Sequence, residues 1–129
     1  QIQDVFEFFH PTENLEENMK KNLEFTCLNN CVIHGFAGYF ETQLYNNVWL
    51  SIKPYTHTPN MRSWFPIYFP ISKPIVAKKG SKIEIVLWRL TNSYKVWYEW
   101  AMSVEPDKDP ENVEETEIHN VNGEHYWIG

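Results

Sequence analysis

Short segments of β-type sequence, each bounded by turn residues, recur along this chain of 129 residues and restrict its fold more than any other feature. They contain alternating polar and apolar residues or brief apolar runs, which suit extended strands better than helices. The sequence therefore predicts an all-β fold, an antiparallel β-barrel or sandwich with at most a short helix at 14–22. The expected strands are 5–9, 23–28, 31–36, 39–44, 48–52, 67–69, 83–89 and 96–103.

Two local patterns refine this prediction near the C-terminus. Even-numbered residues of the segment 96–102 share one face, which places Glu99 on the other, pointing away from the core or into a polar contact. The pair Asn122-Gly123 is a strong signal for a type I′ turn, in which both central residues have positive φ. We therefore expect a hairpin in which 118–121 pairs with 125–128.

Length and composition indicate one well-packed domain. Aromatic residues make up 16% of the chain, and its length suffices for a sizeable core. No apolar run approaches the roughly 20 residues that span a bilayer, so no membrane partner is expected. The chain begins at Gln1 without a signal-peptide pattern, which suggests a fragment or a processed product of a longer protein.

The net charge of -6 is concentrated in one stretch. Residues 105–117 contain seven acids and one base, which by themselves give the whole -6. No basic stripe is present, so nucleic acid is not expected as a partner either. The stretch is expected to be a solvated loop; the alternative is a docking segment for a basic partner.

The side chains that carry catalysis or bind metals are sparse. Cys27 and Cys31 lack the further ligands of a zinc site, so we expect no metal and two buried, reduced thiols. His34 lies in an apolar stretch and is interpreted as a hydrogen-bonded core residue. Glu41 and Glu99 either pair as acid and base or face solvent as polar strand residues.

A cofactor cradle is not apparent, and no catalytic residue is predicted in this chain. Gly35 and Gly38 form only a G-x-x-G pattern, without the third glycine of a dinucleotide-binding loop.

The run THTPNMRSWFPIYFP at 56–70 is the candidate binding segment. Its prolines at 59, 66 and 70 fix φ and withhold hydrogen-bond donors, so they stiffen the segment and keep it out of a regular sheet. Trp64 and Phe65 either pack in the core or face a partner from this stiff loop.

Four sequence blocks together resemble a known family. HGFAGYFET, THTPNMRSWFPIYFPI, KVWYEWA and IHNVNGEHYWIG keep the order and approximate spacing of the C-terminal β-barrel domain of the protein arginine methyltransferase 5 family. The resemblance covers nearly all of 1–129. It implies a type II, symmetric-dimethylating enzyme, active in the cytoplasm and nucleus, whose Rossmann-like and TIM-barrel-like domains lie outside this chain.

The resemblance also implies a role for the candidate loop. Ser63, Trp64 and Phe65 match the loop that reaches the substrate groove, so they are expected to bind arginine-containing protein substrates such as histone tails and Arg-Gly-rich proteins. S-adenosylmethionine and the catalytic glutamates would be bound outside the fragment, which would form homo-oligomers and be inactive alone. The alternative is a free-standing β-sandwich module that binds peptides or glycans.

Overall fold

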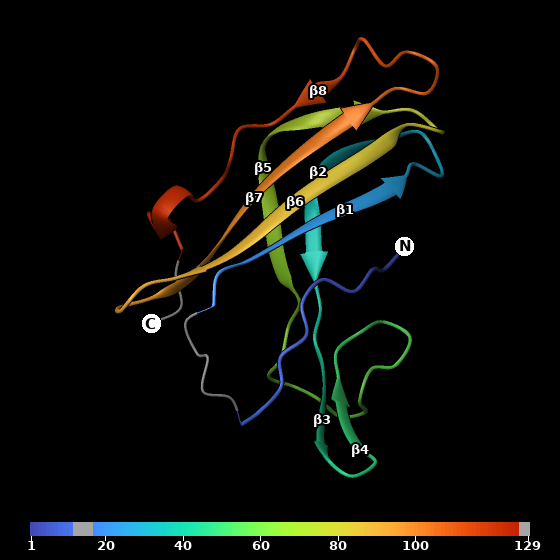
Figure 1. Cartoon of the computed structure of the whole chain (residues 1–129). Coiled ribbons are helices and arrows are strands. Elements are labelled where there is room, and N and C mark those ends of the chain that lie inside the picture. Colours follow the sequence, from blue (N-terminus) through green and yellow to red (C-terminus); the bar gives the residue numbers. More distant parts are fainter. Residues whose placement is uncertain (12–16, 127–129) are drawn as a thin grey trace. The chain divides into compact units, whose positions relative to one another are not determined.

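The computed structural model describes residues 1–11 and 17–126, which form antiparallel strands and one 3-10 turn (Figure 1). The all-β prediction is therefore confirmed. Two compact units can be separated, and each is described by itself. Unit 1 comprises Gln1–His34 and Ile71–Gly129, and unit 2 comprises Gly35–Pro70.

The strands form three sheets, in the orders β1-β6-β7-β8, β2-β5 and β3-β4. Within the described residues, β1 and β8 are the outer strands of the largest sheet, so this sheet is open and suits a sandwich better than a closed barrel. The elements are β1 (Met19–Thr26), β2 (Cys31–Gly38), β3 (Glu41–Tyr45), β4 (Val48–Ser51), β5 (Ile67–Ala77), β6 (Lys82–Thr91), β7 (Val96–Glu105), β8 (Glu114–Glu115) and η1 (Val121–Gly123).

The core of unit 1 follows the strand alternation. Leu23 on β1 lies opposite Ile85 on β6, which lies opposite Met102 on β7. All three are buried, and burial of each such side chain stabilises the fold by roughly 1.5–3 kcal/mol. On the opposite face, Glu84 pairs in register with Ser103, as expected where a sheet meets solvent.

The N-terminal segment differs from the prediction. Residues 5–9 do not form a strand; instead the side-chain amides of Gln1 and Gln3 donate to backbone carbonyls of β1. Phe8 lies 5.0 Å from the guanidinium of Arg89, within cation–π range. Side-chain contacts thus replace the backbone ladder that the β-type sequence suggested.

The expected short helix is wrong where it can be checked. Its last four residues belong to β1, because they pair in register with β6 from Met19 onward. Most of the earlier residues of 14–22 lie outside the described part of the chain.

The C-terminal hairpin prediction was right about the turn and wrong about the pairing as far as residue 126; residues 127 and 128 lie outside the described part of the chain. Asn122 and Gly123 have φ of 56° and 61°, the positive values expected, but they lie in η1 and not in a hairpin. A Cβ on Gly123 would lie 2.9 Å from Cγ of Trp97, so the turn packs closely on β7. The buried side chain of Asn120 then captures the following backbone at residues 125 and 126.

Strand β5 continues past the point where the sequence placed its end. Pro70 and Pro74 both lie inside β5, although Pro70 was expected to keep its segment out of a sheet. In the described residues β5 has β2 as its sheet neighbour on one side. The two prolines are four residues apart, so the backbone positions at which they lack an N–H group face the same edge of β5. Both prolines can therefore lie on the edge that has no sheet neighbour among the described residues.

Candidate functional site

The candidate loop in unit 2 is tied to β4 by short polar side chains. The backbone N–H of Ser51 donates to Oγ1 of Thr58 (2.9 Å), and the Thr58 N–H donates to the Ser51 carbonyl (2.9 Å). The hydroxyls of Ser51 and Thr56 lie 2.8 Å apart. Ser51 is 3% exposed, so these bonds are shielded from water. The start of the loop is therefore well anchored.

Glu41 on β3 completes this anchor. Its carboxylate accepts from Oγ1 of Thr56 (3.1 Å) and from Nζ of Lys53 (3.4 Å). Desolvation, the largest single influence, raises the pKa of Glu41, but hydrogen bonds from Thr56, Lys53 and Ser51 with the charge of Lys53 outweigh it and lower the pKa overall. Glu41 is thus held ionised as a structural acceptor.

Sequence reasoning missed this network. The sequence signal that could have predicted it is Thr56-His57-Thr58 in the loop after β4, because hydroxyl side chains in loops often form hydrogen bonds with nearby backbone.

The aromatic side chains of the candidate loop are open to solvent. Trp64 is 58% exposed and Phe65 79% exposed, and Ser63 is also exposed. The core interpretation of these aromatics is therefore wrong. The ring of Trp64 meets that of Phe40 edge-to-face, with centroids 5.5 Å apart and planes at 78°. Phe40 thus orients the indole while much of it stays accessible.

The two glycines of the G-x-x-G pattern serve packing. A Cβ on Gly35 would lie 2.3 Å from the carbonyl oxygen of Phe69, and one on Gly38 would lie 2.7 Å from Ile67. Both positions need glycine because β5 approaches β2 closely there. They therefore provide no open cradle for a cofactor.

The other candidate catalytic residues either make structural hydrogen bonds or face solvent. Oε2 of Glu99 accepts from the indole N–H of Trp97 (2.8 Å) and from the backbone N–H of Asn122 (3.1 Å), which confirms the predicted polar contact. His34 is exposed, so its interpretation as a core histidine is wrong. On β2 its side chain therefore faces solvent.

The cysteines also differ from the prediction. Both are free, but Cys27 is buried while Cys31 is exposed. Their sulfurs lie 3.5 Å apart. The hydrogen bond with Cys27, then desolvation and the charge of Cys27, raise the pKa of Cys31.

Residues 1–11 and 17–126 show no group of three or more His, Cys, Asp or Glu side chains arranged to hold a metal ion. A search of the same residues found no helix long and apolar enough to cross a membrane.

Comparison with known proteins gives a consistent result. The PRMT5 oligomerisation domain matches residues 1–128. The chain belongs to this family. The chain is 45% identical to protein arginine N-methyltransferase 5 of Oryza sativa subsp. indica over 132 residues, which cover 98% of this chain and 19% of that relative. The resemblance predicted from the four sequence blocks is confirmed.

Relatives from other organisms show the same relationship. Protein arginine N-methyltransferase 5 of Xenopus laevis is 43% identical over 126 residues, covering 96% of this domain and 19% of the relative. Protein arginine N-methyltransferase skb1 of Schizosaccharomyces pombe is 38% identical over 135 residues, covering 95% and 22%. The chain thus spans about a fifth of the length of these relatives.

Proposed function

We propose that this chain is the substrate-side domain of a full-length protein arginine N-methyltransferase of the symmetric, type II class. In this proposal Ser63, Trp64 and Phe65 form part of the groove that receives a substrate arginine. The observation that carries it is the indole of Trp64, which is 58% exposed yet oriented by Phe40.

Such an indole suits arginine for a physical reason. A guanidinium is planar and always charged, and it stacks on an aromatic face with roughly 0.5–2 kcal/mol of stabilisation, depending on desolvation. Stacking leaves the nitrogens of the guanidinium free for hydrogen bonds with other groups. Trp64 would therefore orient the substrate without exchanging a proton with it.

The G-x-x-G pair offers no open cradle for S-adenosylmethionine. The glycine pair is filled by the approach of β5, as the short Cβ distances at Gly35 and Gly38 indicate. We infer that the cofactor and the catalytic carboxylates belong to other parts of the full-length protein.

The decisive experiment compares aromatic variants of one loop in the full-length enzyme. Trp64→Ala should lower kcat/KM for methyl transfer to an arginine peptide roughly 2- to 30-fold, the equivalent of 0.5–2 kcal/mol. Trp64→Phe should lose less, because a ring face remains. Tyr55→Ala is the matched control, since Tyr55 lies in the same connection and is 92% exposed.

Thermal unfolding of each variant separates orientation from folding. Equal losses of turnover for Trp64→Ala and Tyr55→Ala, or a loss that follows reduced stability, would contradict the proposed role of Trp64.

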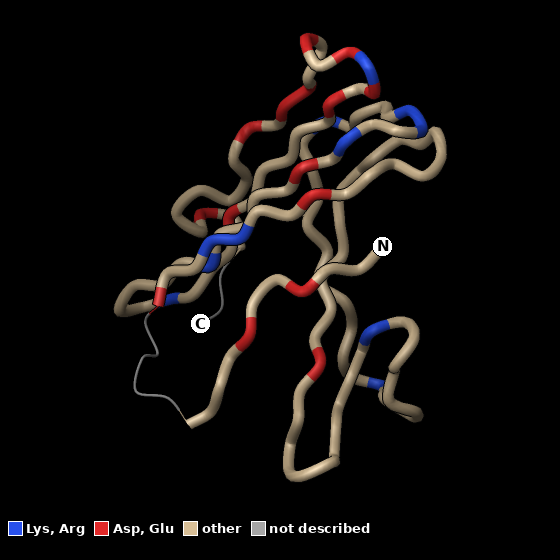
Figure 2. The backbone as a smooth tube through the Cα atoms, turned by 45° about the vertical axis from the view of Figure 1, so that its right-hand side comes forward, with Lys and Arg blue, Asp and Glu red and all other residues tan. Residues whose placement is uncertain are grey.

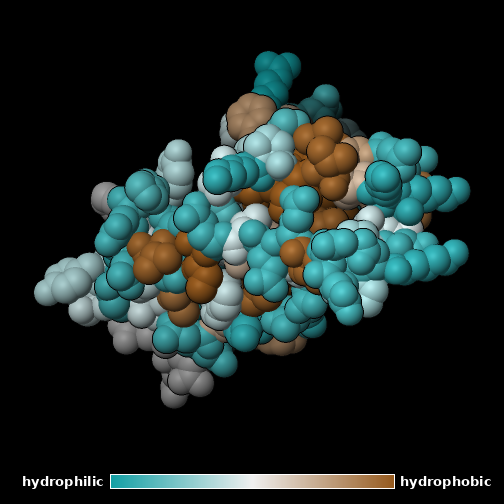
Figure 3. Space-filling view, turned by 90° about the horizontal axis from the view of Figure 1, so that it is seen from above, coloured by the Kyte–Doolittle hydropathy of each residue, from teal (hydrophilic) through white to brown (hydrophobic). Residues whose placement is uncertain are grey.

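We also propose that the domain associates with a second copy of the full-length protein. Large hydrophobic side chains are unusually exposed, and Figure 3 shows hydrophobic patches bordered by hydrophilic side chains on one face. The β3-β4 hairpin exposes Leu44, Tyr45, Val48 and Trp49, each by more than half of its surface. Replacing two of them with Glu should dissociate the oligomer in light scattering, whereas Tyr94→Glu should not.

A peptide- or glycan-binding module remains the second candidate, because exposed aromatic rings also stack on sugars. Saturable quenching of tryptophan fluorescence by a glycan panel would favour it, provided that Trp64→Ala removes the effect.

A further inference from the structure

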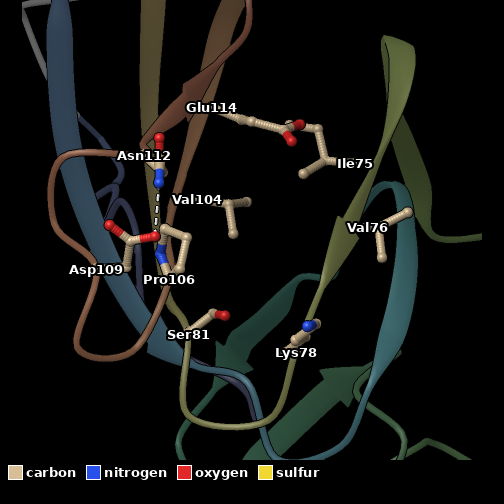
Figure 4. A pocket seen from close by; sticks show the side chains of 9 residues that line it. All are labelled: Ile75, Val76, Lys78, Ser81, Val104, Pro106, Asp109, Asn112 and Glu114. Carbon is tan, nitrogen blue, oxygen red and sulfur yellow. Dashed lines mark hydrogen bonds between the residues drawn. The ribbon is translucent and has the colours of Figure 1, made fainter.

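A pocket of about 230 Å³ lies in unit 1 between β5, the start of β6, the end of β7 and the acidic stretch 105–117 (Figure 4). Its volume is below the roughly 300–1,000 Å³ of pockets that hold drug-sized ligands, so it suits one side chain better than a nucleotide. It shares no residue with the loop of Ser63, Trp64 and Phe65.

Part of the pocket wall is apolar. Ile75 and Val104 line it and are 5% and 3% exposed, so they belong to the core of unit 1 and are held rigidly. Pro106 adds a third apolar surface where the acidic stretch leaves β7. An aliphatic chain would find complementary contacts here.

Ser81 provides an unused hydrogen-bonding group. It is 2% exposed, and its backbone is fully engaged, with the N–H donating to the Lys78 carbonyl and the carbonyl accepting from the Cys27 N–H. Its hydroxyl has no hydrogen-bond partner within the described residues, and it points into the pocket (Figure 4). No buried side-chain nitrogen or oxygen of the described residues lacks a hydrogen-bond partner, so this hydroxyl is open to the pocket, where water or a ligand atom can reach it.

The charge around the pocket is negative. Glu114 on β8 and Asp109 contribute carboxylates against the single ammonium of Lys78. Asp109 accepts from the side chain of Asn112 (2.6 Å), whereas the Glu114 side chain has no ion-pair or hydrogen-bond partner among the described residues. Figure 2 shows further acids along the same connection.

We propose that this pocket binds the long basic side chain, lysine or arginine, of a peptide segment. The aliphatic stem lies against Ile75 and Val104, and the nitrogen donors meet the Glu114 carboxylate and the Ser81 hydroxyl. Such a side chain combines an apolar stem with a charged end, which is the combination that the pocket offers. The surrounding acids attract basic segments at a distance.

Binding of a basic side chain in this pocket is separate from the proposed role of the loop at Trp64 and does not depend on it. A metal ion is disfavoured as the occupant, because the described residues supply no cluster of three ligands. An anion is disfavoured because the two carboxylates outnumber the one ammonium.

The test uses the full-length protein and capped pentapeptides with a central lysine, arginine or norleucine between glycines. Dissociation constants are measured by saturation-transfer NMR at low salt. We expect the lysine or arginine peptide to bind and the norleucine peptide, which keeps the stem without the charge, to bind much more weakly. Equal binding of all three would overturn the proposal.

Two variants locate the site. Glu114→Gln should weaken binding of the basic peptide roughly fivefold, the upper range for an exposed ion pair. Ser81→Ala should weaken it roughly tenfold through loss of a hydrogen bond to a charged donor, without lowering thermal stability, because the hydroxyl has no partner in the folded chain.

The controls separate this site from others. Glu115→Gln changes the neighbouring residue of β8, which does not line the pocket, and should leave binding unchanged. Trp64→Ala should leave binding of the lysine peptide unchanged while lowering turnover, so failure of the pocket and failure of the substrate loop are distinguishable. Equal effects of Glu114→Gln and Glu115→Gln, or loss of lysine-peptide binding in Trp64→Ala, would overturn the proposal.

Discussion

Asn120 offers the sharpest test of how the C-terminal end of unit 1 is held. It is 6% exposed, and its amide makes four hydrogen bonds: it donates to the carbonyls of Tyr98 and Tyr126 (both 2.8 Å) and accepts from the N–H groups of His125 (3.1 Å) and Tyr126 (3.0 Å). Within the described residues, this side chain links the segment after η1 to β7.

The stability that is lost when Asn120 is replaced can be estimated from these hydrogen bonds. Each net hydrogen bond contributes roughly 0.5–1.5 kcal/mol, so four give about 2–6 kcal/mol, and about 3 kcal/mol is expected because water can reach some of the partners after the change. Asn120 also has φ of 59°, a left-handed conformation that glycine adopts freely. Asn120→Gly therefore loses only the hydrogen bonds, whereas Asn120→Ala loses about 1 kcal/mol more through backbone strain.

Hydrogen exchange of the backbone amides of 118–126 measures this directly in the full-length protein. A loss of about 3 kcal/mol corresponds to roughly 100-fold faster exchange through local opening. Asn29→Ala, an exposed change in the same unit, serves as the control. Exchange within about threefold of wild type for both Asn120 variants would refute the hydrogen-bond argument, and equal exchange for the two would refute the strain argument.

Gly35→Ala should destabilise unit 2 by roughly 3 kcal/mol or more, because a Cβ would lie 2.3 Å from the Phe69 carbonyl oxygen, and even overpacking without a backbone clash costs roughly 1–3 kcal/mol; wild-type thermal unfolding would contradict this. Because the pKa of Glu41 is lowered in the folded state, its stabilising contribution is present above its unfolded pKa and is lost as pH falls through the folded pKa. Glu41→Gln should therefore lose less stability than wild type between about pH 7 and pH 3, and matching pH profiles would show the argument to be wrong. Because a hydrogen bond with Cys27 raises the pKa of Cys31, Cys27→Ala should speed alkylation of Cys31 by iodoacetamide near neutral pH, as mass spectrometry can measure; an unchanged rate would count against that cause.

The strands of unit 1 were predictable because their information is local. The segment 83–89 alternates at first and then runs apolar, as in a strand that is buried on one face and then on both, and β6 extends it by one residue at its start and two at its end. The segment 5–9, VFEFF, is also rich in β-type residues but does not form a strand. A β-type sequence is thus not enough to form a strand, because it does not provide a partner with which to pair.

The candidate site was predictable only in part. Proline and aromatic residues marked the connection before β5, and the resemblance singled out Trp64 within it. Whether Trp64 is buried depends on what covers it, and the partner that orients it, Phe40, lies in a different connection. The unpartnered hydroxyl of Ser81 left no trace in the sequence, because its significance comes from a pocket formed by distant segments.

The sequence by itself determined the all-β class, the approximate place of most strands, the positive φ of Asn122 and Gly123 and the family, because each depends on neighbouring residues or on their order. Only the tertiary structure decided which of these elements pair and which side chains are buried. Asn120 bonds to Tyr98, 22 positions earlier in the chain, and Ser81 accepts from the backbone of Cys27, so both depend on contacts between distant residues. Burial and hydrogen-bond partnership are properties of such contacts, which local preferences do not specify.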